Sequence, residues 1–160
     1  MTVTAFDADD LHVRQAERAD LLAILEIEKA SFSQPWPYEA FTNFLGEPGF
    51  LVAEEGGQTV GYVVSDVTST HGQRLGHVKD VAVHPDRRGD GVGSTLLTRA
   101  LTELTVQGAD SVKLEVREGN DDAKRLYRTF DFEPLRRVQG YYEDGEDAIV
   151  MVRKLGDPTW

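Results

Sequence analysis

Hydrophobic residues recur along this chain with two different spacings. A spacing of three or four residues predicts helices over residues 18–31, 91–107 and 120–130. The stretch QPWPYEAFTNFL predicts another short helix with Pro37 in its first turn, and Asn120 is the predicted N-cap of the last helix.

Shorter apolar runs, alternating or continuous, predict strands. The stretch GFLVAEEGGQTVGYVVSDV predicts a hairpin whose turn is Glu55-Gly56-Gly57-Gln58. Further strands are predicted over residues 10–16, 75–84, 111–117, 132–139 and 147–154.

The predicted elements follow one another in the order β-α-α-β-β-β-α-β-α-β-β, which is typical of a mixed α/β domain. Residues 75–116 form a strand-helix-strand unit, whose length requires a right-handed crossover between two parallel strands. We expect a single domain over residues 1–160, with its core at about residues 10–155.

Composition narrows the function classes. The sequence is 40% hydrophobic and contains no Cys, which excludes disulfides, thiolate metal sites and a Cys nucleophile and fits a reducing cytoplasm. The stretch MTVTAFDADDLHVRQ lacks the regions of a signal peptide, and no apolar run approaches the roughly 20 residues of a membrane span. We therefore expect a soluble, cytoplasmic protein with no membrane partner.

The formal net charge of -11 argues against nucleic acid as a partner, because an acidic surface repels phosphates. Only five of the 17 basic residues are Lys. Acidic excess with scarce Lys is typical of proteins from a high-salt cytoplasm, where salt screens the self-repulsion. An ordinary acidic cytosolic protein is the alternative.

A glycine-rich loop, RRGDGVGSTLL, precedes the predicted helix over residues 91–107. A Walker loop requires a Lys that is missing here. A dinucleotide fingerprint requires a third glycine where this chain has Ser94 or Leu96.

A pyrophosphate cradle is the remaining anion site. Gly89, Gly91 and Gly93 would let the backbone approach an anion, and the first amides of the helix would point at it. Arg87 and Arg88 add positive charge to an otherwise acidic chain. The alternative is a loop whose glycines only turn the chain.

Three stretches carry a family resemblance. VAVHPDRRGDGVGSTLL resembles the acyl-CoA-binding motif of the GCN5-related N-acetyltransferases (GNAT), with Arg88-Gly89-Asp90-Gly91-Val92-Gly93 in the R/Q-x-x-G-x-G/A positions. Residues 114–133 and 141–151 are similar to the RimI-type branch of that family, which acetylates protein N-termini. The family usually has Gly at the position of Asp131, and Asp is among the residues that tolerate a left-handed conformation.

The resemblance covers nearly the whole chain and implies the GNAT fold. That fold is a mixed, mostly antiparallel seven-stranded sheet with a central parallel pair, here residues 75–84 and 111–117, and about four helices. It also implies acetyl transfer to the N-terminal α-amino group of proteins, by direct attack in a ternary complex, because no Cys can relay the acetyl group.

The implied cosubstrate is acetyl-CoA, whose pyrophosphate would contact the backbone amides of residues 88–94. The pantetheine arm would run along Val81, Ala82 and Val83, and the N–H of Val81 would polarise the thioester carbonyl. Asn120 would contact CoA by the same analogy, although a helix cap alone explains it. Contact with the 3'-phosphate of CoA is one interpretation of Lys124, Arg125 and Arg128, and a solvated basic face is the favoured one.

Glu115 is the candidate general base, since alternation puts it on the face opposite Val112, Leu114 and Val116. The alternative is a carboxylate paired with Lys113 or Arg117. Tyr127 aligns with the general acid of the family, whereas its place in the stripe Ala123-Leu126-Tyr127-Phe130 alone favours a core aromatic.

Phe32, Trp36, Tyr141 and Tyr142 are candidates to line an acceptor groove, with plain packing as the alternative for each. The four His residues, His12, His71, His77 and His84, show no metal-ligand spacing, so we expect no metal.

Two other functions stay open. A Lys side chain or a small amine is an alternative acceptor, and a non-catalytic acyl-CoA-binding module is the alternative of a different class. A ribosomal protein is one candidate acceptor, and the chain is expected to be a monomer or a weak homodimer.

Overall fold

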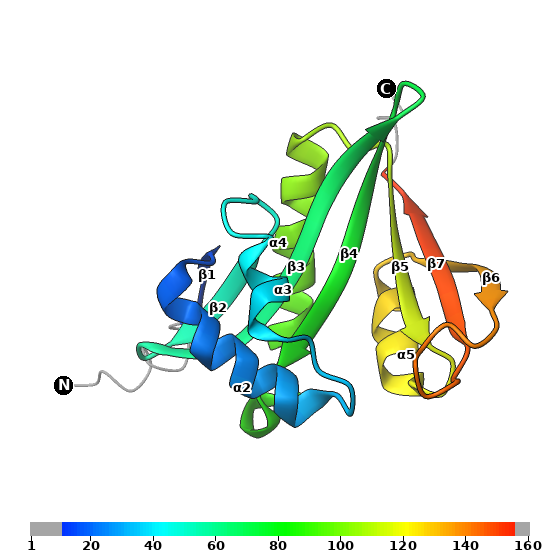
Figure 1. Cartoon of the computed structure of the whole chain (residues 1–160). Helices are drawn as coiled ribbons and strands as arrows, with labels where there is room; N and C mark the ends of the chain where they lie inside the picture. Colours follow the sequence, from blue (N-terminus) through cyan, green and yellow to red (C-terminus); the bar gives the residue numbers. More distant parts are fainter. Residues whose placement is uncertain (1–10, 156–160) are drawn as a thin grey trace. The chain divides into compact units, whose positions relative to one another are not determined.

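The computed structural model describes residues 11–155 and shows two compact parts. The first part contains residues 11–65 and 80–103, and the second contains residues 66–79 and 104–155. Figure 1 traces the elements through both. In chain order they are β1 (Leu11–Gln15), η1 (Arg18–Asp20), α2 (Leu21–Ser31), α3 (Tyr38–Thr42), β2 (Leu51–Glu55), β3 (Gln58–Thr70), β4 (Gln73–Val83), η2 (Pro85–Arg87), α4 (Val92–Val106), β5 (Ser111–Arg117), α5 (Asp121–Thr129), β6 (Glu133–Val138) and β7 (Ala148–Lys154).

The described residues contain seven strands in one sheet, in the order β1-β2-β3-β4-β5-β7-β6. Strand β4 runs parallel to β5, with Leu75–Val78 opposite Ser111–Leu114, because helix α4 carries the chain between them. The β1-β2, β2-β3, β5-β7 and β6-β7 pairs are antiparallel. The predicted fold class, its parallel pair and its four α-helices are therefore confirmed.

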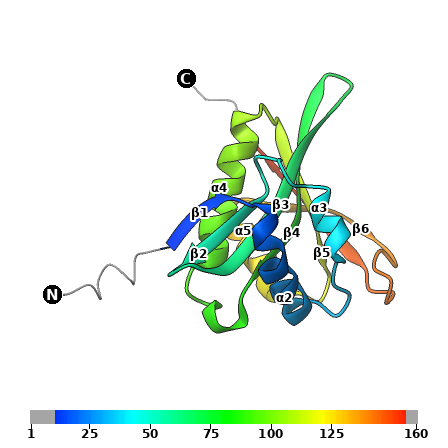
Figure 2. The ribbon, with the colours of Figure 1, turned by 60° about the vertical axis from the view of Figure 1, so that its left-hand side comes forward.

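In the first part, α2 and α4 cover opposite faces of β2 and β3, as Figure 2 shows. Alternation along β3 explains this arrangement. Tyr62 and Val64 belong to the apolar cluster that α2 and α3 close. Gly61 faces α4, where a Cβ would lie 3.0 Å from Leu96 Cδ1 and 3.1 Å from the Ala82 carbonyl oxygen. A glycine is therefore required for α4 to pack this closely.

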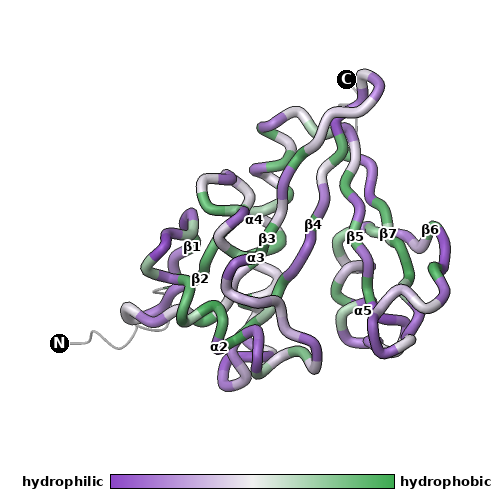
Figure 3. Tube along the Cα trace, in the orientation of Figure 1, coloured by the Kyte–Doolittle hydropathy of each residue, from purple (hydrophilic) through white to green (hydrophobic). Residues whose placement is uncertain are grey.

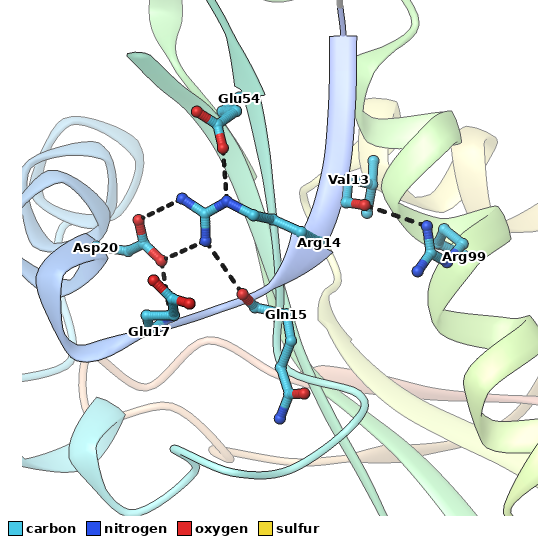
Figure 4. Close-up of polar contacts among 7 residues, drawn as sticks. All are labelled: Val13, Arg14, Gln15, Glu17, Asp20, Glu54 and Arg99. Carbon is cyan, nitrogen blue, oxygen red and sulfur yellow. Dashed lines mark hydrogen bonds and ion pairs between the residues drawn. The ribbon is translucent and has the colours of Figure 1, made fainter. Parts of the chain in front are cut away.

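Arg14 of β1 joins three segments of the first part (Figure 4). Its guanidinium donates to both carboxylate oxygens of Asp20 at 2.9 Å and to Glu54 Oε1 at 2.5 Å. Asp20 also accepts the N–H of Glu17 at 2.7 Å, which caps η1. Burial raises the pKa of Asp20, but the hydrogen bonds from Arg14 and Glu17 outweigh it and hold that pKa below 3.8. The network therefore positions the start of α2.

In the second part, the inward side chains of β5 are Val112, Leu114 and Val116, all buried as alternation predicts. The apolar residues of β7 are visible beside β5 in the hydropathy colouring of Figure 3. Helix α5 packs on this core through Tyr127 and begins at Asn120, whose Oδ1 accepts the Ala123 N–H at 3.1 Å. The predicted N-cap is confirmed.

Asp131 adopts the left-handed conformation that the sequence comparison with the family predicts, with φ of 66°. It closes a Schellman motif at the end of α5, in which the Asp131 N–H donates to the Arg128 carbonyl and the Phe132 N–H donates to the Tyr127 carbonyl. The Tyr127 and Phe132 rings meet edge to face at 6.0 Å.

Three details differ from the sequence predictions. Pro37 is the N-cap of α3 and not part of its first turn, because its ψ of 164° is extended and the helix begins at Tyr38. β3 continues to Thr70, and a turn with positive φ at His71 and Gly72 leads into β4. The predicted strand over residues 10–16 is shorter, and Asp10 and the N-terminal stretch before it lie outside the described residues. A single domain over residues 1–160 stays a prediction.

Candidate active site

The glycine loop lies in the first part, between η2 and α4. Gly89 and Gly91 both have φ of +85°, which side chains rarely adopt, and a Cβ at either position would meet open space. Glycine is therefore required at both positions by backbone conformation. Gly93 differs, since it lies inside the first turn of α4.

Helix α4 begins at Val92, and the Gly91 carbonyl accepts the Thr95 N–H at 3.0 Å. The first amides of a helix have no acceptor within it and carry the positive end of its dipole. Val92 is buried, whereas Gly93 and Ser94 are half-buried. The anion site at the start of α4 stays a prediction.

The two arginines of the loop differ, which corrects the expectation that both add positive charge. Arg87 forms ion pairs with Glu55 and with Asp90, the latter at 3.1 Å, so its charge is compensated locally. Arg88 donates to neutral oxygens instead, the Val83 carbonyl at 3.1 Å and Ser31 Oγ at 2.9 Å. Arg88 is therefore the stronger candidate to face an anion.

Val81, Ala82 and Val83 lie on β4 beyond the residues that pair with β5. Ala82 is buried against the core of the first part, so its neighbours point to the other face of the strand. Burial raises the pKa of the Asp80 carboxyl, and a hydrogen bond from the backbone N–H of Val81 opposes that rise.

In the second part, the polar faces of β4 and β5 bring three side chains together. Glu115 and Lys113 were expected to pair in one interpretation of the sequence, and His77 was not expected there. Glu115 Oε1 lies 2.7 Å from His77 Nε2, and Glu115 Oε2 lies 3.3 Å from Lys113 Nζ. His77 Nδ1 lies 3.3 Å from Lys79 Nζ. Because a carboxylate only accepts hydrogen bonds, His77 Nε2 is the donor to Glu115.

Glu115 is largely buried, with 13% of its side chain exposed. Burial raises its pKa, but the hydrogen bond from His77 and the charges of His77 and Lys113 outweigh that effect, so the pKa lies below 4.5. Glu115 is therefore an ionised acceptor at neutral pH. The sequence allowed two interpretations of Glu115, a general base or a carboxylate paired with Lys113. The pairing is present, and the same carboxylate is still the candidate base.

Tyr141 and Tyr142 lie in the loop between β6 and β7, with their rings edge to face at 5.0 Å. Arg117 Cζ lies 4.1 Å from the centre of the Tyr142 ring, and Arg117 also donates to Asp144 Oδ2 at 2.8 Å and Glu146 Oε1 at 2.9 Å. Arg117 thus anchors the loop from the end of β5.

The phenols of this loop are protonated. Burial raises the pKa of Tyr142 to about 12, with a further contribution from Tyr141 that exceeds the opposing effect of Arg117. Burial also raises the pKa of Tyr141, and the negative charge of Glu115 adds to the rise. Tyr141 is therefore close enough to Glu115 to respond to its charge.

The remaining candidates all have structural roles. Tyr127 is 7% exposed and packs in the core of the second part, as its helical stripe predicts. Asn120 caps α5. Phe32 and Trp36 pack partly buried against the core of the first part, where Trp36 contacts Phe41 at 5.2 Å. Their proposed contacts with CoA or acceptor stay predictions.

His77 is the residue that sequence reasoning missed. The signal was present, because Gly76 and Val78 are the inward residues of β4 and His77 must share the opposite face. Parallel pairing then places His77 opposite Lys113, diagonal to Glu115.

No cluster of three or more His, Asp or Glu side chains suited to a metal occurs between residues 11 and 155. Within the same residues, no helix is both long and apolar enough to cross a bilayer.

Comparison with known proteins assigns the family. The profile of the acetyltransferase (GNAT) family matches residues 21–132, and the chain belongs to this family. The N-alpha-acetyltransferase RimI of Mycobacterium tuberculosis is 35% identical over 159 residues, covering 96% of this chain and 98% of the relative.

Two solved structures share the fold and more than a quarter of their residues with this chain. The crystal structure of Ard1 from Thermoplasma volcanium matches with a TM-score of 0.86 at 27% identity, covering 92% of this chain and 99% of that one. The ribosomal-protein-S18-alanine N-acetyltransferase from Escherichia coli matches with a TM-score of 0.81 at 27% identity, covering 92% and 96%.

Proposed function

We propose that this protein transfers the acetyl group of acetyl-CoA to the N-terminal α-amino group of other proteins. The observation that carries the proposal is the partly buried, ionised Glu115, held by His77 at 2.7 Å on the polar face of β4 and β5. Family membership supports it, as do the names of the relatives, which include an N-alpha-acetyltransferase and a ribosomal-protein-S18-alanine N-acetyltransferase.

The chemistry favours an α-amine over a Lys side chain. The ammonium of an N-terminus has a pKa of about 7.7 to 8.0, whereas that of Lys is near 10.4. A carboxylate with a lowered pKa is a weak base, so it suits an acceptor that is partly neutral already. Glu115 would take the proton directly or through a water, and His77 would orient it.

Acetyl-CoA is the proposed cosubstrate. Its pyrophosphate would contact the backbone amides of Arg88–Ser94, and its pantetheine arm would pair with Val81–Val83. Attack of the amine on the thioester forms the amide and releases the CoA thiolate, which needs one proton. Tyr127 is the proposed donor of that proton, and the Val81 N–H the proposed donor to the carbonyl oxygen.

The acceptor would approach aromatic and acidic residues. Phe32 and Trp36 in the first part, and Tyr141 and Tyr142 in the second, are the proposed contacts for its first residues. The acidic loop that contains Asp144 and Glu146 would attract a cationic N-terminus. A ribosomal protein is a proposed acceptor, and the cytoplasm the proposed location.

The test is acetyl transfer from acetyl-CoA to two matched peptide sets in about 1 M KCl. One set has free N-termini and no Lys, and the other has blocked N-termini and a single Lys. We expect transfer to the first set alone, and loss of most of that transfer in the Glu115→Gln protein. Transfer to the second set alone, or to neither set while acetyl-CoA still binds, would refute the proposed acceptor.

A further inference from the structure

Arg88 of the glycine loop is exposed and forms no ion pair with an acidic side chain in residues 11–155. Its two contacts are neutral oxygens. Nε donates to the Val83 carbonyl at 3.1 Å, and Nη2 donates to Ser31 Oγ at 2.9 Å. A long, exposed side chain ordinarily keeps much rotamer freedom, and these two bonds restrict it.

Ser31 reaches the loop from a distant part of the sequence. It is the last residue of α2, and the loop after β4 lies beside this helix (Figure 1). Its hydroxyl donates to the Ile27 carbonyl, one turn earlier, at 2.7 Å. A serine hydroxyl has one proton and two lone pairs, so this bond uses the proton and leaves the lone pairs for Arg88. The hydroxyl is therefore oriented as an acceptor.

The contacts of Arg88 use only one side of its guanidinium. Nε and Nη2 share one edge of this planar group, and both donate to protein oxygens. Nη1 donates to no acceptor in residues 11–155. Phosphate oxygens are strong acceptors for guanidinium N–H groups. Arg88 is thus held through one edge, while Nη1 remains able to donate to a phosphate.

The charge of the chain explains why this cation matters. The net charge is -11, so a phosphate ligand needs a local positive charge where it binds. Glu55 and Asp90 already compensate Arg87. Arg88 is the arginine of this loop that can supply that charge.

We propose that Ser31 is a positioning residue, whose hydroxyl holds the Arg88 guanidinium ready for the pyrophosphate of acetyl-CoA. The proposal rests on the proposed function for the identity of this ligand. Without the hydroxyl, Arg88 gains rotamer freedom that it loses again when the ligand binds, so the affinity falls. Ser31 acts through Arg88 and not on the reacting groups, so turnover at saturating acetyl-CoA is unchanged.

The first test is a double-mutant cycle in the dissociation constant of CoA, measured by calorimetry. We expect Ser31→Ala to raise this constant about threefold to tenfold, as the loss of one hydrogen bond predicts. In an Arg88→Met background the same change should alter it by less than about 1.5-fold, because no guanidinium remains to be held. Ser31→Thr keeps the hydroxyl and should stay within about twofold of the parent. Ser33→Ala, an exposed change after the same helix, is the control and should leave the constant unchanged.

The second test decides which phosphate Arg88 contacts, because CoA carries both a pyrophosphate and a 3'-phosphate. Dephospho-CoA keeps the pyrophosphate and lacks the 3'-phosphate. We expect Ser31→Ala to weaken the binding of both ligands by the same factor. In acetyl transfer, the KM for acetyl-CoA should rise by that factor, and kcat should stay within about twofold.

Three results would overturn the proposal. One is a CoA affinity that Ser31→Ala leaves unchanged. Another is an equal effect of Ser31→Ala in the parent and in the Arg88→Met background, because Ser31 would then not act through Arg88. The third is an effect on CoA that disappears with dephospho-CoA.

The cycle also separates this proposal from the proposed function. A parent protein that binds CoA and acetylates no peptide would refute the proposed acceptor, whereas the cycle would still test Ser31. A parent protein without affinity for CoA would refute both. Circular dichroism establishes that each variant is folded, and Ser31→Gly takes the place of Ser31→Ala in the cycle if the latter does not fold.

Discussion

The Asp131→Gly protein should be more stable than the Asp131→Ala protein by about 1 kcal/mol. Asp131 has φ of 66°, and its N–H and that of Phe132 close the Schellman motif at the end of α5. A residue with a Cβ pays about 1–2 kcal/mol in this conformation. Glycine avoids that cost but loses about 0.5–1 kcal/mol of conformational freedom on folding. The net difference favours glycine.

Comparing the two variants removes a second effect. The carboxylate of Asp131 lies at the negative end of the α5 dipole, which is unfavourable by about 0.3–1 kcal/mol. Both variants lack this carboxylate, so the effect cancels between them. Relative to the parent, only the glycine variant gains from both changes and should be the most stable of the three.

Urea unfolding followed by circular dichroism measures the difference, and melting temperatures should differ by about 2–4 °C. Arg125, an exposed residue inside α5, supplies a control of opposite sign. There, alanine should be more stable than glycine by about 0.8–1.0 kcal/mol. Equal stability of the two Asp131 variants, or a more stable alanine variant, would refute the strain argument.

Three further predictions concern the site and its surroundings, and a fourth concerns salt. Glu115→Gln should lower kcat about 10²- to 10⁴-fold with unchanged acetyl-CoA affinity by calorimetry, and equal turnover in both proteins across the pH range would remove Glu115 from the mechanism. Arg117→Met should raise the peptide KM about threefold to tenfold, because Tyr142 and its loop lose the contacts that hold them. Arg117→Lys should raise the KM less, because the charge is kept. Identical KM values in the three proteins would contradict the role of Arg117. The pKa of Asp20 is lowered in the folded state, so its contribution to the free energy of unfolding is complete above pH 3.8 and is lost as the pH falls through the folded-state pKa. Arg14→Met should therefore move the midpoint of acid unfolding to higher pH. An unchanged midpoint would argue against the network of Arg14 and Asp20. The melting temperature should rise between dilute buffer and about 1 M KCl if the acidic surface is an adaptation to salt, and the absence of a rise would exclude that origin of the charge.

Single elements of this fold could be read from the sequence because their signals are local. The alternation in residues 111–117 and the paired glycines after Glu55 place a strand and a hairpin turn within a residue of their observed positions. The parallel β4-β5 pair also followed from the sequence, since the connection through α4 permits no other direction.

The candidate site residues also divide into those set by local sequence and those set by contacts between distant residues. The cap at Asn120 depends on the conformation of a few consecutive residues, and it is as predicted. The φ of +85° at Gly89 and Gly91 is also local, but it does not decide between an anion site and a loop that only turns the chain. The ion pair of Arg87 could not be predicted from local sequence. Its partner Glu55 lies at the end of β2, far from Arg87 along the chain. The local sequence therefore indicated that both Arg87 and Arg88 add positive charge, whereas the charge of Arg87 is compensated in the structure.

The sequence by itself determined the order of helices and strands and the outward direction of Glu115, because periodicity and backbone preference act over a few residues. Only the tertiary structure decided which charges meet. His77 reaches Glu115 across 38 residues of sequence, and Glu28 reaches Tyr62 across 34. The ionisation of Glu115 depends on burial and on groups within hydrogen-bonding distance, and neither exists until the strands and helices have packed.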